Sequence, residues 1–138
     1  MRELKVAYGG SRNALKWSNK TITFDALCER LKVTNRTPET AEEYPRLPKD
    51  ERDSVKDKGG LVGGYLREGR RKADNVLFRS LASHDVDTPD DGFLERYRAQ
   101  HRFASVLYST HSHTPEASRY RIFTPFTRDV TPDEYVAI

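Results

Sequence analysis

Strand signals and helix signals alternate along this chain, and their order constrains its fold more than any other feature. Segments in which apolar and polar residues alternate are typical of strands, because successive side chains of a strand point to opposite faces. Glycines flank the second of these segments, which indicates that another backbone or a ligand approaches closely there. Strands are therefore predicted at residues 4–8, 61–66, 76–86, 104–109 and 119–126.

Helix signals occupy most of the intervals between these strands. Capping residues, and apolar residues spaced three or four apart, are typical of helix starts and of amphipathic helices. The sequence therefore predicts an α/β fold, with a mixed β-sheet flanked by helices. Helices are predicted at 23–32, from 37 to the break at Pro45, at 88–100 and from 131 onward, with 48–57 either a helix or a solvated loop.

The length and composition of the chain set the size of its core. A chain of 138 residues suits one domain, and a hydrophobic content of 36% predicts a small core. No apolar run approaches the roughly 20 residues that a membrane span needs, and no signal peptide is recognisable. Cys28 is the single cysteine, so no intramolecular disulfide can form, which is typical of a cytoplasmic protein. On its helix, Cys28 is expected to act as a small buried hydrophobe.

Charge is distributed unevenly along the chain. The formal net charge is only +3, but residues 37–57 carry seven acids and four bases, a net charge of −3. Residues 58–79 carry six bases and two acids, a net charge of +4. A local basic excess is typical of a phosphate-binding face, although an ordinary solvated face has the same composition.

Asp85 and Asp87 follow the apolar part of the predicted strand at 76–86. Residues two apart on a strand point to the same face, so both carboxylates project together. Two such charges repel each other unless a cation lies between them, and Mg²⁺ favours carboxylate oxygens together with substrate phosphates. The pair is therefore a candidate divalent metal site. The alternative is that the two acids begin a loop and help to cap the helix that starts at Thr88.

A polar segment with two histidines follows the predicted strand at 104–109. Ser109, His111 and His113 lie where a strand delivers side chains to a site. A histidine there can donate a hydrogen bond to a phosphate oxygen or bind a metal. Zinc would require more nitrogen or sulfur ligands than this segment offers. The alternative is a polar turn between two strands.

Arginine and lysine side chains supply candidate phosphate contacts. Arg70, Arg71 and Lys72 are consecutive, and guanidinium groups offer forked donors that match phosphate oxygens. Arg119 and Arg121 alternate on the last predicted strand and therefore share a face. If that face also carries Asp85, the site combines acids for a metal with bases for phosphate; the sequence leaves this orientation open.

These motifs, in this order and spacing, resemble those of the archaeo-eukaryotic primase superfamily. The run from Asp85 to Asp87 is similar to the D-h-D motif of that superfamily, and the run from Ser109 to His111 is similar to its s-x-H motif. The resemblance is nearest to the N-terminal part of primase-like replication proteins of phages, plasmids and integrated elements. It extends over nearly the whole chain through the stretches 59–64, 69–76, 108–116, 119–121 and 125–135.

The resemblance implies a fold and roles for these residues. It implies a partial primase-polymerase palm-like domain that performs template-directed nucleotidyl transfer in mobile-element replication. Asp85 and Asp87 would hold catalytic Mg²⁺ or Mn²⁺, and His111 would contact the phosphates of the incoming nucleoside triphosphate. Arg119 or Arg121 would support that nucleotide, and nucleic acid would be the second partner.

One departure from the family pattern divides the functional hypotheses. The family has a third catalytic acid on a strand after the helix that begins at Thr131, and the chain ends at Ile138 before such a strand. The domain at 1–138 is therefore expected to be incomplete relative to the family and inactive alone. The alternative is a non-catalytic, primase-derived mobile-element protein. Such a protein would bind nucleic acid or inhibit a host protein such as a CRISPR effector, as an anti-CRISPR.

Overall fold

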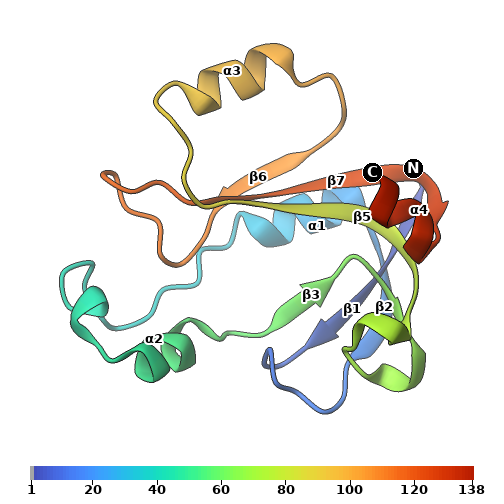
Figure 1. Cartoon of the computed structure of the whole chain (residues 1–138), viewed down its shortest axis with the longest axis horizontal. Coiled ribbons are helices and arrows are strands. Elements are labelled where there is room, and N and C mark those ends of the chain that lie inside the picture. The colour runs from blue at the N-terminus through green and yellow to red at the C-terminus, as the bar shows by residue number, and fades with distance from the viewer. Residues whose placement is uncertain (1) are drawn as a thin grey trace.

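The computed structural model describes residues 2–138, which form two β-sheets with helices around them (Figure 1). Sheet A has the strand order β2-β1-β3, and sheet B has the order β4-β5-β7-β6. Every strand pair in the two sheets is antiparallel. The strands are β1 (Glu3–Gly9), β2 (Ser18–Thr23), β3 (Gly60–Val62), β4 (Gly64–Leu66), β5 (Val76–Val86), β6 (Val106–Ser109) and β7 (Tyr120–Val130).

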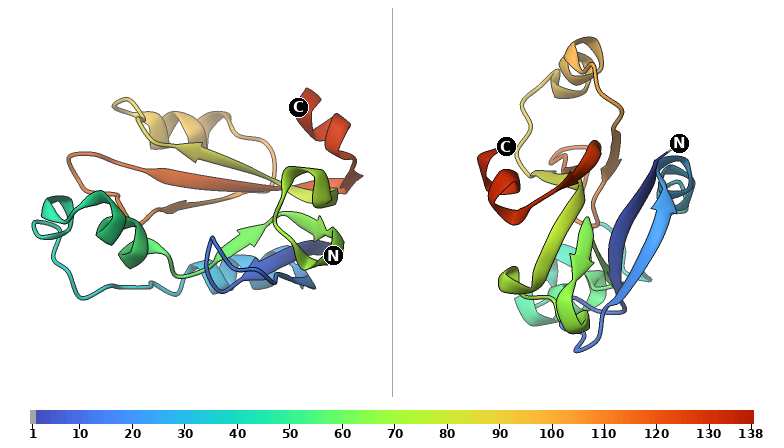
Figure 2. Two further views of the ribbon diagram at one scale, coloured as in Figure 1. Left: turned by 60° about the horizontal axis from the view of Figure 1, so that its bottom comes forward. Right: turned by 90° about the vertical axis from the view of Figure 1, so that its right-hand side faces the viewer.

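Four α-helices and three short 3-10 helices connect the strands. Helix α3 stands apart from the sheets on the arm that joins β5 to β6 (Figures 1 and 2). None of the helices described in residues 2–138 has the length and apolar character that crossing a membrane requires. The helices are α1 (Phe24–Leu31), η1 (Tyr44–Arg46), α2 (Lys49–Lys56), η2 (Arg67–Gly69), η3 (Ala73–Asn75), α3 (Phe93–Gln100) and α4 (Pro132–Ala137).

The main core lies where sheet A, sheet B and α1 meet. Thr23 caps α1 by accepting a hydrogen bond from the Ala26 backbone, as its sequence predicts. The apolar face of the helix then brings Leu27 into the core, where only 1% of its surface is exposed. Leu27 packs there with residues of β1, β5 and β7, namely Leu4, Val6, Leu81 and Phe123. Cys28, expected to be buried, is only partly buried, and its burial raises the pKa of its thiol.

The two sheets are joined at a corner made by Gly63 and Gly64. The extended segment 60–66 pairs with β1 of sheet A through β3, and with β5 of sheet B through β4. At the corner the Gly63 carbonyl accepts hydrogen bonds from the Ser80 and Leu81 backbones. A Cβ atom on Gly64 would lie 1.9 Å from the Phe78 carbonyl oxygen, so only glycine fits there. The close approach of another backbone, expected from the sequence, is confirmed.

The predicted α/β class is confirmed, and the strand directions correct the expectation of a mixed sheet. The segment that contains α3 joins β5 to β6, but these two strands are not neighbours. Instead, β7 lies between them and runs antiparallel to both. Strand β2 was not predicted, because most of its side chains are polar and exposed and carry no apolar alternation.

Two predicted helix starts are wrong. The segment after Thr37 forms bends, turns and the short 3-10 helix η1. Pro45 has no backbone N–H, so an α-helix from Pro38 could not continue past it, and the residues between the two prolines are too few for a stable helix. Helix α3 begins at Phe93 and not at Thr88. Gly92 caps it in a left-handed conformation, with φ at 78°, which no residue inside a helix adopts. Helix α2 settles the open choice at 48–57 in favour of a helix.

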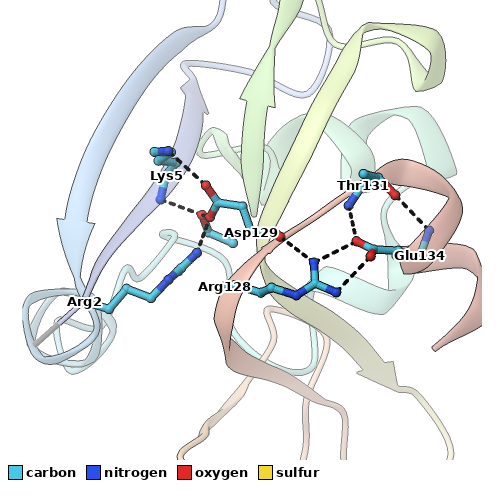
Figure 3. Close-up of polar contacts among 7 residues, drawn as sticks. Arg2, Lys5, Arg128, Asp129, Thr131 and Glu134 are labelled. Atoms are coloured by element: carbon cyan, nitrogen blue, oxygen red, sulfur yellow. Dashed lines mark hydrogen bonds and ion pairs between the residues drawn. The ribbon is translucent and has the colours of Figure 1, made fainter.

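A buried hydroxyl ties β1 to sheet B (Figure 3). Ser80 of β5 is fully buried, and its Oγ accepts a hydrogen bond from the Lys5 backbone at 2.9 Å. The same hydroxyl donates to Asp129 Oδ1 of β7 at 2.6 Å, and Lys5 Nζ donates to Oδ2 at 2.9 Å. Arg2 forms a further ion pair with this carboxylate. Asp129 lies beyond the strand predicted at 119–126 but within β7, where its carboxylate joins three strands.

Asp129 connects the protein's stability to pH. Partial burial raises the pKa of the Asp129 carboxyl, but the hydrogen bonds from Ser80 and Lys5 and the charge of Arg2 outweigh it, so the pKa lies below its ordinary value. The folded state therefore gains stability from the ionised carboxylate above the unfolded-state pKa of about 4. That stability is lost as the pH falls through the lower folded-state pKa.

We predict that Asp129→Asn lowers the free energy of unfolding at pH 7 by about 2 kcal/mol, because it removes charge-assisted hydrogen bonds to a buried hydroxyl. The variant should also lose less stability than the wild type as the pH falls below about 4. Urea denaturation at a series of pH values measures both effects. Asp74→Asn, at an exposed carboxylate with no described partner, is the control and should unfold like the wild type. Equal stability of Asp129→Asn and wild type would contradict this role.

Candidate functional site

The two acids of the D-h-D motif each face an arginine on the neighbouring strand. In the antiparallel register of β5 and β7, Asp85 lies opposite Arg121. Arg121 Nε donates to Asp85 Oδ1 at 2.6 Å, and a second guanidinium nitrogen donates to Oδ2 at 3.3 Å. One step further along, Arg119 lies 3.7 Å from an Asp87 oxygen. All four side chains are therefore cross-strand neighbours at one end of sheet B.

This pairing balances the charges of the motif. Each carboxylate has a guanidinium partner, so the two acids do not stand as a free dicarboxylate. No group of three or more acidic, histidine or cysteine side chains that could hold a metal ion occurs within residues 2–138. The side chains present therefore do not by themselves fit a divalent metal, and the binding of Mg²⁺ or Mn²⁺ by Asp85 and Asp87 stays a prediction.

The histidines of the second motif lie in the turn between β6 and β7. His111 Nε2 shares a hydrogen bond with Thr37 Oγ1 at 2.8 Å, and its ring meets Tyr44 edge-on. His113 Nδ1 instead accepts a hydrogen bond from the Arg119 backbone. The turn follows directly on Ser109, which ends β6 opposite Tyr120. His111 thus lies at the same end of sheet B as Asp85, and no contact joins the two within residues 2–138.

A groove of about 210 Å³ opens between the two sheets beside this motif. Sheet B contributes Tyr108 and Arg121 to it, and sheet A contributes Tyr8. Arg30 of α1 and Lys58 complete its polar lining, while Leu27, Leu31, Leu61 and Phe123 supply apolar contacts. We call this feature the inter-sheet groove. Among the residues that the structure describes, none that lines it is acidic.

The groove combines three cationic groups with two tyrosines. The Arg30 guanidinium lies 4.3 Å from the centre of the Tyr8 ring, in cation–π geometry. The Tyr8 hydroxyl is buried and lacks a hydrogen-bond partner among residues 2–138. Burial raises the pKa of Tyr108, and the neighbouring Arg121 offsets part of that shift.

Asp57 holds the backbone that forms one wall of the groove. Its carboxylate accepts hydrogen bonds from Ser11 Oγ at 2.6 Å and from the Arg12 backbone at 2.9 Å. The bond from Ser11, followed by that from the Arg12 backbone, keeps the pKa of Asp57 below its ordinary value. These bonds fix the turn after β1 against Gly59, which has a φ of 104° and lies against the Gly9 carbonyl. The groove therefore has a fixed backbone wall.

Sequence reasoning found Arg121 but missed the other polar groups of the groove. Tyr8 and Tyr108 are ordinary strand residues in the sequence, and Arg30 is an ordinary surface position of a helix. Only the glycines at 59–60 signalled a close approach at this place. The groups come together because β1, α1 and β7 pack around one core, and no local spacing encodes that packing.

The basic segment Arg70 to Lys72 lies away from the acids. Its residues are exposed in the connection between β4 and β5, near the start of β5, whereas Asp85 is near the other end (Figure 1). Arg71 lies over the Trp17 ring at 5.4 Å and donates to the Arg12 carbonyl at 3.2 Å. The segment is therefore a separate exposed cationic surface, and not a part of the groove.

We predict that Arg70, Arg71 and Lys72 contribute to weak, salt-dependent nucleic-acid binding. Lysine and arginine contacts to phosphates release counterions, so affinity should fall as salt rises. Replacing all three residues with alanine should weaken binding to every sequence and reduce the slope of log affinity against log salt. Fluorescence anisotropy with a labelled oligonucleotide measures this slope. A triple variant that binds as well as the wild type would show that the segment is only a solvated face.

Comparison with known proteins gives one match. Residues 1–138 match the family model described as the VapE N-terminal domain. VapE proteins are a family of primase-like proteins of phages and plasmids. Comparison with curated proteins gives no match, and comparison with solved structures gives none either.

Proposed function

The chain belongs to the VapE N-terminal domain family, and we propose that it is the nucleotide- and nucleic-acid-binding domain of a mobile-element primase-polymerase. The observation that carries this proposal is the inter-sheet groove, in which Arg30, Lys58 and Arg121 converge without an opposing acid in the lining. Such a set of donors matches a phosphate chain, because guanidinium and ammonium groups form charge-assisted hydrogen bonds with its oxygens.

The size of the groove restricts what it takes. Its volume of about 210 Å³ is below the roughly 300 Å³ at which pockets for whole drug-sized ligands begin. The proposed occupant is therefore the phosphate chain of a nucleoside triphosphate, with its base outside. Asp85, which holds Arg121 in place from the neighbouring strand, would act as a positioning residue.

We predict that the domain binds dATP and inorganic tripolyphosphate with similar affinity, because the phosphates supply most of the contacts. Arg30→Gln and Lys58→Gln should each weaken binding about tenfold, the loss expected for one charge-assisted contact. Isothermal titration calorimetry measures these affinities. The control is Arg46→Gln, an exposed residue of η1 outside the groove, which should bind like the wild type.

Two outcomes would contradict the groove assignment. The first is that Arg30→Gln and Lys58→Gln bind tripolyphosphate as tightly as the control. The second is that the wild type binds dATP but not tripolyphosphate, since recognition would then depend on the base. Circular dichroism of each variant would check that a lost affinity does not come from lost structure.

Nucleotidyl transfer is the reaction that the archaeo-eukaryotic primase motifs imply for the family. In this chain the motif acids Asp85 and Asp87 are paired with arginines, and no third acid joins them within residues 2–138. A two-metal reaction requires carboxylates that bridge and orient two cations. We therefore propose that this domain contributes binding, and that the chain alone lacks a complete set of catalytic ligands.

We predict that the chain alone does not synthesise primers in the presence of Mg²⁺ or Mn²⁺. The assay uses labelled nucleotides and a single-stranded template, with Asp85→Asn as the comparison. Synthesis that is robust in the wild type and lost in Asp85→Asn would show a complete active site and contradict this proposal.

The arginine pairing also favours a second candidate function, a primase-derived domain without catalysis. Such a domain would bind nucleic acid or a host protein, for example as an inhibitor of a CRISPR effector. The two candidates differ in the nucleotide test, because only the first requires the groove to bind triphosphate. If the wild type inhibits a CRISPR effector in a phage infection assay and Arg30→Gln does not, both functions depend on the same groove.

A further inference from the structure

A row of aromatic rings runs along the arm that carries α3. The Tyr120 ring of β7 stacks on Phe93 at a centroid distance of 6.1 Å, with the ring planes 15° apart. Phe93 stacks on Tyr97 at 5.9 Å, and Tyr97 stacks on His101 at 4.5 Å. Phe103 then meets His101 edge-on at 5.8 Å. We call these five side chains the aromatic row.

The row ends in an unusually exposed ring. Phe103 has 74% of its surface exposed, whereas the other four rings are partly buried. It lies in the connection between α3 and β6, and the arm stands away from the sheets (Figures 1 and 2). The Phe103 ring is not part of the core, since Phe103 packs against neither described hydrophobic cluster. An exposed phenylalanine at the end of a stack offers a face to a further planar group.

Arginines accompany the rings. Residues 96–103 read Arg-Tyr-Arg-Ala-Gln-His-Arg-Phe, with three arginines and no acid. Arg96 forms an ion pair with Asp90. Arg98 and Arg102 are exposed, and neither has a described ion-pair partner within residues 2–138. By helical spacing Arg98 lies three residues after Glu95 on the same side of α3, so the cation next to Phe103 is Arg102.

We propose that this arm is a binding site for single-stranded nucleic acid, in which a base stacks on Phe103 and the adjacent phosphate contacts Arg102. Sites of this kind combine aromatic platforms with cationic groups that follow the backbone. Bases within a duplex are already stacked on each other, so an exposed ring selects single strands. The charged residue next to Phe103 is Arg102, and its positive charge favours a polyanion over an apolar protein surface.

The site is distinct from the inter-sheet groove and does not depend on nucleotide binding there. Residues next to each other on a strand face opposite sides, so Tyr120 belongs to the aromatic row while Arg121 lines the groove. It is also distinct from the basic segment Arg70 to Lys72, which lies on a different connection.

The test measures fluorescence anisotropy of labelled oligothymidine and of a labelled duplex of the same length. Phe103→Ala is expected to weaken oligothymidine binding about tenfold and to change duplex binding little. Phe103→Leu should weaken it similarly, because leucine keeps the apolar surface but loses the ring. Phe103→Trp should retain or improve binding. Arg102→Gln should bind more weakly and show a smaller salt slope.

Controls separate this site from the other surfaces. Val136→Ala, at a side chain that is 87% exposed on α4, should bind like the wild type. Because Phe103 is exposed, its variants should keep the wild-type melting temperature. The alanine variant of residues 70–72 should lower duplex and single-strand binding alike, whereas Phe103→Ala should lower single-strand binding selectively.

Three results would overturn the proposal. The first is equal oligothymidine affinity in Phe103→Ala, Phe103→Leu and wild type. The second is tight binding by Phe103→Leu and weak binding by Phe103→Ala, since apolar surface and not ring stacking would then be required. The third is unchanged nucleic-acid binding together with loss of a self-association seen by analytical ultracentrifugation of the wild type, which would assign Phe103 to a protein contact.

Discussion

The connection between the two sheets determines where this domain can bind anything. Near one end of β5, Ser80 and Asp129 hold β1 against sheet B, and the glycine corner at 63–64 passes the chain from one sheet to the other. Toward the other end of β5, Asp85 and Arg121 pair on the rim of a groove between the sheets, and polar side chains occupy the gap. The polar contacts that join the sheets and the groove between them therefore lie at different positions along β5.

The arginine–aspartate pairs at the end of β5 give a structural explanation for the two acids of the D-h-D motif, which the sequence alone does not provide. Two carboxylates on one strand face repel each other, and a protein can offset this repulsion with a metal or with cationic side chains. Here Arg121 of β7 pairs with Asp85, and Arg119, which directly precedes β7, lies near Asp87. The partly exposed Asp85–Arg121 pair adds little stability by itself. Its main effect is to orient the Arg121 guanidinium toward the groove.

Much of the fold was predictable, because its signals are local. The strand at 76–86 and the capping box from Thr131 to Glu134 follow from alternation and capping residues within a few positions. The errors arose where local signals conflict. Prolines at 38, 45 and 48 interrupt the helix signal that begins at Thr37, and Gly92 overrides the capping residues at Thr88. The groove could not be predicted for a different reason. Arg30, Lys58 and Tyr8 lie on separate elements that meet only through tertiary packing, whereas Asp85 and Arg121 belong to recognisable motifs.

Strand β7 links the two proposed binding surfaces physically. Tyr120 and Arg121 are consecutive, and strand geometry sends the first to the aromatic row and the second to the groove. A substitution in β7 would disturb both surfaces and could not separate their roles. Residues away from β7 avoid this problem, because Arg30 and Lys58 reach the groove from α1 and the turn before β3, and Phe103 is exposed on the arm. If phosphate binding depends on the first two and single-strand binding on the third, the domain has two independent sites that share one structural strand.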